Sequence, residues 1–124
     1  MQELLFEASW EKALSTQDRQ NIEELFNETK HIKSPETHCS PLRVAINHKE
    51  ALLVTVLVHN FSNQLLTFNN IKVSYYIEGE RIAEETFTLP VLAISSKVSM
   101  PWTFIFPKGS YIARPSYENG RLEI

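Results

Sequence analysis

The chain has 124 residues, of which 43% are hydrophobic and 22% are charged, a composition typical of a single globular domain. Its net charge of −3 provides no basic surface for nucleic acid, and its one cysteine excludes an internal disulfide. The N-terminal residues contain neither a basic region nor a long apolar run. We therefore expect no signal peptide, no membrane span and a cytoplasmic location.

Residues 1–33 are predicted to form a short strand and a helical arm. Leu4-Leu5-Phe6 is too short to stand alone, so we expect it to pair at the edge of a sheet. Ser9 is the predicted N-cap of a first helix that ends near Leu14. Ser15, which lies three residues before Asp18, predicts the start of a second helix.

The arm carries most of the charge asymmetry of the chain. Residues 1–40 hold eight acidic and four basic residues, whereas residues 41–107 hold five of each. An acidic helix face in water is one interpretation, and a surface for a basic partner is the other. The apolar residues of the arm fall at helical spacing and are expected to cover one face of a sheet: Trp10, Leu14, Ile22, Leu25 and Phe26.

Two prolines and several small polar residues indicate a loop over residues 34–41. Strand patterns then follow one another through residues 42–107. Residues 43–47 form the first, and residues 52–59 form a central strand because both of its faces are apolar. The helical arm is the expected cover for one of these faces.

The later strands alternate apolar and polar residues. A strand over residues 71–77 is joined by the turn Glu78-Gly79-Glu80 to a strand over residues 81–89. In the last strong strand, residues 98–106, alternate residues are apolar. Because proline cannot donate a ladder hydrogen bond, this strand must lie at an edge or begin after Pro101.

Strands at roughly ten-residue spacing predict a mainly β protein, either a sandwich or a barrel. Of the two we favour an immunoglobulin-like antiparallel β-sandwich with a short N-terminal helical arm. We expect one domain over residues 1–124, with the arm in 1–33 and the sandwich body in 42–107. Residues 108–124 are expected to be a loosely held tail with a short strand near its end.

Catalytic and metal-binding patterns are not assembled in this sequence. His31, His38, Cys39 and His48 are zinc-binding types, but their spacing matches no known zinc motif. Cys39 is expected in a loop as a surface or half-buried thiol, without the helix N-terminus or oriented base that activates a nucleophile. We predict no catalytic residue, no cofactor and no metal, and therefore no enzyme.

Three aromatic residues remain as candidates for a partner surface. Phe61 stands alone in a polar loop, Tyr76 lies on the polar side of its strand, and Trp102 lies on the predicted edge strand. Ordinary packing is the alternative for each of them. An unpaired edge strand also makes a dimer one of the arrangements to test.

Three segments give the chain a resemblance to a known family. They are, in order, Ser9–Leu14 with Ile22–Phe26, then Leu53–Asn60, then Ile82-Ala83 and Phe87–Leu89 with Pro101-Trp102-Thr103-Phe104-Ile105-Phe106-Pro107. Over roughly residues 3–108 the chain resembles the SLAP domain of Firmicutes, which is named for the S-layer assembly proteins of the accessory Sec system.

The resemblance implies a non-enzymatic, protein-binding role in secretion or assembly of S-layer and cell-envelope proteins. The expected partner is a protein, either a component of the secretion machinery or a secreted client. The alternative function is that of an immunoglobulin-like structural or adhesion domain outside the cytoplasm. The resemblance supplies no binding residues.

Overall fold

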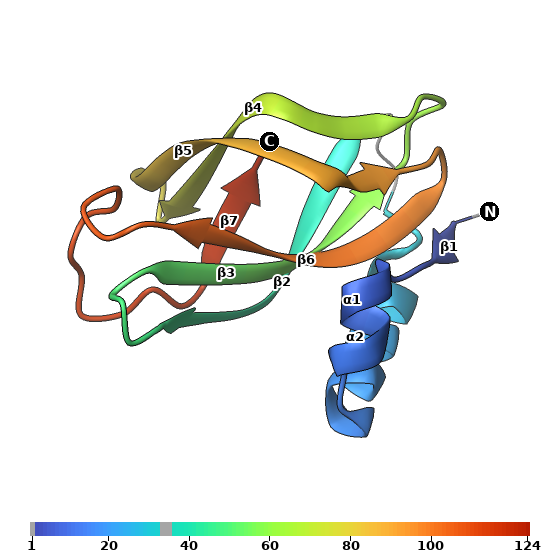
Figure 1. Cartoon of the computed structure of the whole chain (residues 1–124), viewed down its shortest axis with the longest axis horizontal. Coiled ribbons are helices and arrows are strands. Elements are labelled where there is room, and N and C mark those ends of the chain that lie inside the picture. The colour runs from blue at the N-terminus through green and yellow to red at the C-terminus, as the bar shows by residue number, and fades with distance from the viewer. Residues whose placement is uncertain (1, 33–35) are drawn as a thin grey trace.

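The computed structural model describes residues 2–32 and 36–124 (Figure 1). Seven strands and two helices follow one another along this part of the chain. Their bounds are β1 Glu3–Leu4, α1 Ala8–Ala13, α2 Thr16–Thr29, β2 Thr37–Ile46, β3 Leu52–Asn60, β4 Leu66–Ile77, β5 Glu80–Ile94, β6 Val98–Phe106 and β7 Gly120–Glu123. No helix among these residues is both long enough and apolar enough to cross a membrane.

The strands form two sheets that pack face to face as a sandwich. The first has the strand order β1-β6-β3-β2, and the second has the order β5-β4-β7. Figure 1 shows α1 and α2 outside the sandwich, near the N-terminal strand. The predicted mainly β sandwich with an N-terminal helical arm is confirmed, and the immunoglobulin-like connectivity stays a prediction.

Strand β3 is the central strand that its sequence predicts. It pairs with β2 on one side and with β6 on the other, antiparallel to both. Val54, Val56 and Val58 face the second sheet and belong to the core, whereas Leu57 and His59 face the arm. All five of these side chains are buried, so β3 is covered on both faces.

Aromatic rings join the two sheets in the core. Phe104 of β6 lies 5.8 Å from Phe68 of β4 and 5.3 Å from Phe87 of β5, measured between ring centroids. Phe87 also meets Phe106 edge-on at 5.6 Å. Such edge-to-face contacts add to the free energy gained by burying the rings. One continuous cluster of buried residues therefore connects both sheets.

The arm confirms one predicted helix start and corrects the other. The Ser15 hydroxyl caps α2 by accepting from the backbone N–H of Asp18 at 3.0 Å. Glu7, not Ser9, caps α1, because its carboxylate accepts from the backbone N–H of Ser9. A carboxylate suits this position because the free N–H groups of a helix start carry partial positive charge.

The expected loop over residues 34–41 is wrong from Thr37 onward. Strand β2 begins at Thr37, where it pairs with Asn60, and it includes Pro41. Residues 34 and 35 lie outside the described part of the chain. Proline is tolerated here because β2 is the last strand of its sheet, and its pairing with β3 shifts register between Pro41 and Arg43.

The C-terminal residues are held more firmly than a loose tail. Strand β7 pairs with β4, and its Leu122 is 4% exposed within the core. Tyr75 of β4 donates a hydrogen bond to the carbonyl of Tyr117, just before β7. The short terminal strand is therefore confirmed, and the expectation of loose attachment is wrong.

Two other strands differ from their expected bounds. Strand β5 runs past residue 89 to Ile94, and its added residues Leu92 and Ile94 are buried in the core. Strand β6 begins before Pro101, at Val98. Within the described residues β1 pairs with β6 only at Val98 and Ser99, so Pro101 lies on the edge that its chemistry requires.

Candidate functional site

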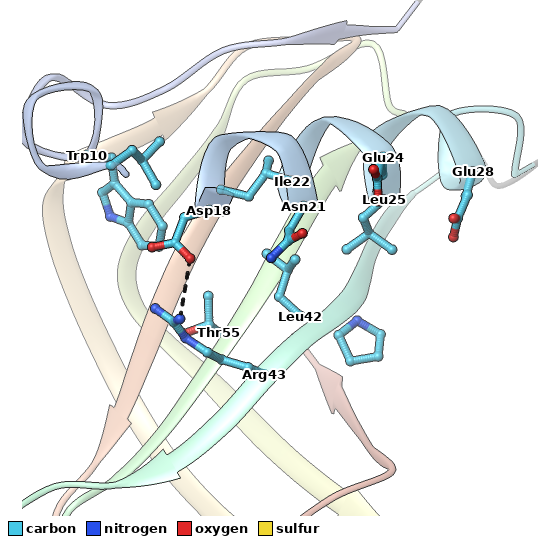
Figure 2. Close-up of a pocket in the computed structure, with 12 residues that line it drawn as sticks. Trp10, Asp18, Asn21, Ile22, Glu24, Leu25, Glu28, Leu42, Arg43 and Thr55 are labelled. Carbon is cyan, nitrogen blue, oxygen red and sulfur yellow. Dashed lines mark ion pairs between the residues drawn. The ribbon is translucent and has the colours of Figure 1, made fainter. Parts of the chain in front are cut away.

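A groove lies on the surface between α2 and β2. Its volume is about 340 Å³. Figure 2 shows α2 along one wall and β2 along the other, with Leu42 and Arg43 on β2. The lining residues are Trp10, Leu14, Asp18, Asn21, Ile22, Glu24, Leu25, Glu28, Pro41, Leu42, Arg43 and Thr55. We refer to this hollow as the arm groove.

The register shift in β2 shapes the floor of the arm groove. Pro41 pairs with Val56, and Arg43 pairs with Thr55, so Leu42 is an extra residue without a cross-strand partner. A bulge of this kind bends the strand and redirects side chains. In Figure 2 the side chains of Leu42 and Leu25 lie between the strand and the helix. Together with Leu14 and Ile22 they make the floor apolar.

The rim of the arm groove is acidic. Asp18, Glu24 and Glu28 supply three carboxylates, against the single guanidinium of Arg43. Asp18 and Arg43 form an ion pair of 3.7 Å, drawn as a dashed line in Figure 2. Among the described residues Glu24 and Glu28 form no ion pair, and both are exposed. The rim therefore offers unpaired negative charge beside an apolar floor.

A chain of hydrogen bonds fixes the arm to the sheet beneath it. The Thr29 hydroxyl donates to the Leu25 carbonyl at 2.6 Å, so it accepts from Nε2–H of His59 at 2.8 Å. Nδ1 of His59 then carries no proton and accepts from the Ser99 hydroxyl at 2.6 Å. The amide of Gln2 donates to Ser99 at 3.0 Å. Every polar atom of the His59 ring is thus satisfied.

The surroundings of His59 keep its ring neutral. Burial lowers the pKa of His59 to about 4, and the nearby His38 ring contributes in the same direction. The rings of Phe26, His38 and Phe61 stack around it, with centroids at 6.5, 6.2 and 5.0 Å. His59 therefore connects the arm to the sheet through hydrogen bonds of an uncharged ring at neutral pH.

The structure separates the three aromatic candidates. Phe61 is 7% exposed and stacks on His59, which agrees with the packing alternative. Tyr76 is half-buried, with the guanidinium of Arg121 5.5 Å from its ring centroid. Trp102 is half-buried, and the centroid of its ring lies 6.3 Å from that of Trp10 of the arm. The partner roles of Phe61, Tyr76 and Trp102 stay predictions, as does the dimer.

The candidate metal ligands and the cysteine are scattered. Within residues 2–32 and 36–124, no group of three His, Cys, Asp or Glu side chains is placed to hold a metal ion. His38 and Cys39 point to opposite faces of β2, because successive residues of a strand do so. Cys39 is buried in the core rather than in a loop, and burial raises its pKa to about 12. Its thiol stays protonated at neutral pH and is therefore a poor nucleophile.

Asn60, which ends the long strand of the family resemblance, has a structural role that sequence reasoning did not assign. Its side-chain amide donates to the carbonyls of Gln64 and Ile94 at 2.8 and 2.9 Å. The side-chain oxygen Oδ1 of Asn60 accepts from the backbone N–H of Ser62 at 3.1 Å. Asn60 thus shapes the loop that follows β3 and ties it to the end of β5.

Comparison with protein families finds a match over most of the chain. The family model of the SLAP domain matches residues 4–119 of this chain. The matched range includes all residues that line the arm groove and both partners of the central strand. No curated protein and no solved structure matches.

Proposed function

Because the chain belongs to the SLAP domain family, we propose that it is a non-enzymatic protein-binding module that assists the secretion or assembly of S-layer and other cell-envelope proteins. The family name, which refers to accessory secretion, supports the pathway. The partner is a protein of the secretion machinery or a secreted client. The proposed site of action is the cytoplasm.

The arm groove is the observation that carries the proposed binding role. It combines an apolar floor with unpaired charge on its rim, and it adjoins the open edge of β2. Concave apolar surfaces with a few polar groups are where proteins hold their ligands. Replacing Leu42 with a charged residue removes apolar area from the floor of the groove. We therefore expect it to lower the affinity for the partner more than it lowers the free energy of unfolding.

Affinity capture from the native host tests this proposal. The wild-type protein should retain a secretion component or a secreted client, identified by mass spectrometry, and Leu42→Glu should lose it. Glu23→Lys is the control, because Glu23 lies on α2 outside the arm groove. Thermal unfolding followed by circular dichroism shows whether each variant is folded. Capture that recovers neither class of protein, or that is unaffected by Leu42→Glu, contradicts the proposal.

A further inference from the structure

We propose that the arm groove and the open edge of β2 bind an extended segment of a partner protein in which basic and apolar residues alternate. This inference rests on the proposed protein-binding function and specifies the chemistry of the partner. It follows from the position of β2, the difference between its two faces and the charge of the rim.

The position of β2 allows another strand to be added. Strand β2 is the last strand in the order β1-β6-β3-β2, so its outer edge is not paired by another strand among the described residues. An edge strand directs alternate backbone N–H and C=O groups outward, and a partner segment can bind them as a new strand. The bulge at Pro41–Arg43 lies on this edge, directly below α2.

The two faces of β2 differ, and an added strand would have to match both. The arm groove lies on one face. On the other face is a second hollow of about 310 Å³, beside Val44, Ile46 and Tyr117. Ile46 is 44% exposed. Because successive side chains of a strand point to opposite faces, one set of partner residues would meet the groove, and the alternate set would cover Val44 and Ile46.

The carboxylates of Glu24 and Glu28 lie on the α2 side of the rim. They are four residues apart on α2, which places them about 6 Å apart along the helix axis. Figure 2 shows that β2 crosses α2 at an oblique angle, so a strand added to β2 would pass these carboxylates obliquely. Basic residues on the groove side of such a strand can therefore approach this negative charge.

The apolar floor suits the same basic residues. Lysine and arginine have long apolar stems that pack on hydrophobic surface while their charged ends remain in water. Stems that cross Leu25 and Leu42 would carry their charges to the rim. The rim has three carboxylates and one guanidinium, so an acidic segment would be repelled and a basic one attracted. On the other face, plain apolar residues suit Val44 and Ile46.

Fluorescence anisotropy with three labelled peptides of about nine residues tests the inference. When extended, such a peptide is about 30 Å long, about twice the length of the rim from Asp18 to Glu28. The first alternates lysine and valine, the second has the same composition with the lysines grouped at one end, and the third alternates glutamate and valine. The first should bind more tightly than the second, and the third should not bind. Glu24→Lys and Glu28→Lys should each weaken binding of the first peptide by about threefold to tenfold.

Glu23→Lys is the matched control for these two variants. It makes the same change in net charge on the same helix, but Glu23 is outside the arm groove, so binding should change by less than about twofold. Equal binding of the alternating and grouped peptides overturns the inference, as does an equal effect of Glu23→Lys and Glu24→Lys. If either occurs while Leu42→Glu still abolishes capture of the native partner, the inference fails and the proposed function stands.

Discussion

His59 is the residue at which the arm, β3 and β6 meet through hydrogen bonds. Its ring nitrogens are occupied by Thr29 of α2 and Ser99 of β6, and the side chain is fully buried. The Ser99 hydroxyl donates a hydrogen bond to the unprotonated Nδ1 of His59. A proton added to Nδ1 would point at this hydroxyl, so the present hydrogen bond would be lost. The charged ring would also lose its hydration. Docking of the arm is therefore linked to the protonation of a single side chain.

This linkage predicts the pH dependence of stability. The pKa of His59 is about 4 in the folded protein, against 6.5 for an unperturbed histidine, so between these values the unfolded chain binds more protons. The free energy of unfolding should be highest above the unfolded pKa and should fall as the pH drops toward the folded one. At about pH 5 the loss from this residue is roughly 2 kcal/mol.

Urea unfolding at about pH 7.5 and pH 5 measures the effect. His59→Gln removes the titrating group, so its free energy of unfolding should be lower at neutral pH but should fall less between the two conditions. His48→Gln is the control, because His48 is exposed in the turn after β2. A wild-type protein whose stability falls no more than that of His59→Gln contradicts the assignment.

Strand β7 shows how an element depends on one small residue. Gly120 begins β7 opposite Ile77 of β4, and a Cβ at this position would lie 2.2 Å from the ring of Tyr75. The Tyr75 ring cannot easily move aside, because it is buried and its hydroxyl is bonded to the Tyr117 carbonyl. A methyl group at Gly120 must therefore displace either the ring or the strand.

We expect Gly120→Ala to lower the free energy of unfolding by about 1–3 kcal/mol, the usual cost of overpacking a core. Chemical denaturation gives this value directly. Glu123→Ala on the same strand is the control and should cost less than about 0.5 kcal/mol, because Glu123 is exposed. Combining Gly120→Ala with Tyr75→Leu should cost less than the sum of the two changes. Additive costs would show that the ring is not the obstacle.

The elements that sequence predicted well are those with strong local patterns. The apolar residues of β3 and the cap of α2 at Ser15 depend on neighbours in sequence. The start of β2 was missed because the prolines at 35 and 41 suggested a loop, although Pro41 falls within the strand. The predicted strand over residues 81–89 stopped short of the full length of β5, which continues through Pro90 to Ile94. Proline excludes a central ladder position, but it permits an edge or an irregular one.

The site was anticipated only in part, for a similar reason. The acidic character of the arm was apparent in the sequence, and it now accounts for the groove rim. The groove itself depends on the bulge at Leu42, which exists only when β2 pairs with β3. The burial of Phe61 likewise depends on the His59 ring and on neighbours brought by distant segments. Long-range pairing of this kind leaves no periodic pattern.

At the scale of the whole molecule, the two layers carry different optical probes. Both tryptophans, Trp10 and Trp102, belong to the arm and the first sheet. Tyr75 and Tyr76 lie in β4, and the remaining two tyrosines, Tyr111 and Tyr117, lie in the segment between β6 and β7. Fluorescence of tryptophan and near-ultraviolet circular dichroism of tyrosine therefore report on separate parts of one core.

Because Phe68, Phe87 and Phe104 join the sheets, we expect the two signals to change together during urea unfolding. Coincident curves would indicate a single cooperative transition. Phe104→Leu should shift both curves to lower urea by the same amount, whereas Val91→Ala, at a position 63% exposed, should shift neither. A tryptophan signal that changes first would show that the arm and its sheet unfold separately.

The parallel pair of β1 with β6 has a consequence for the order in which the protein forms during synthesis. Leu4 is adjacent to Ser99 in the folded protein, so β1 cannot reach its place until β6 has left the ribosome. At usual rates of translation that interval is about ten seconds. During it β2 and β3 can already pair as a hairpin, while Gln2 and Thr29 still lack the Ser99–His59 bridge between them. The acidic arm would then be among the last parts of a nascent chain to settle, and the groove that it borders would be complete only after β6 has emerged.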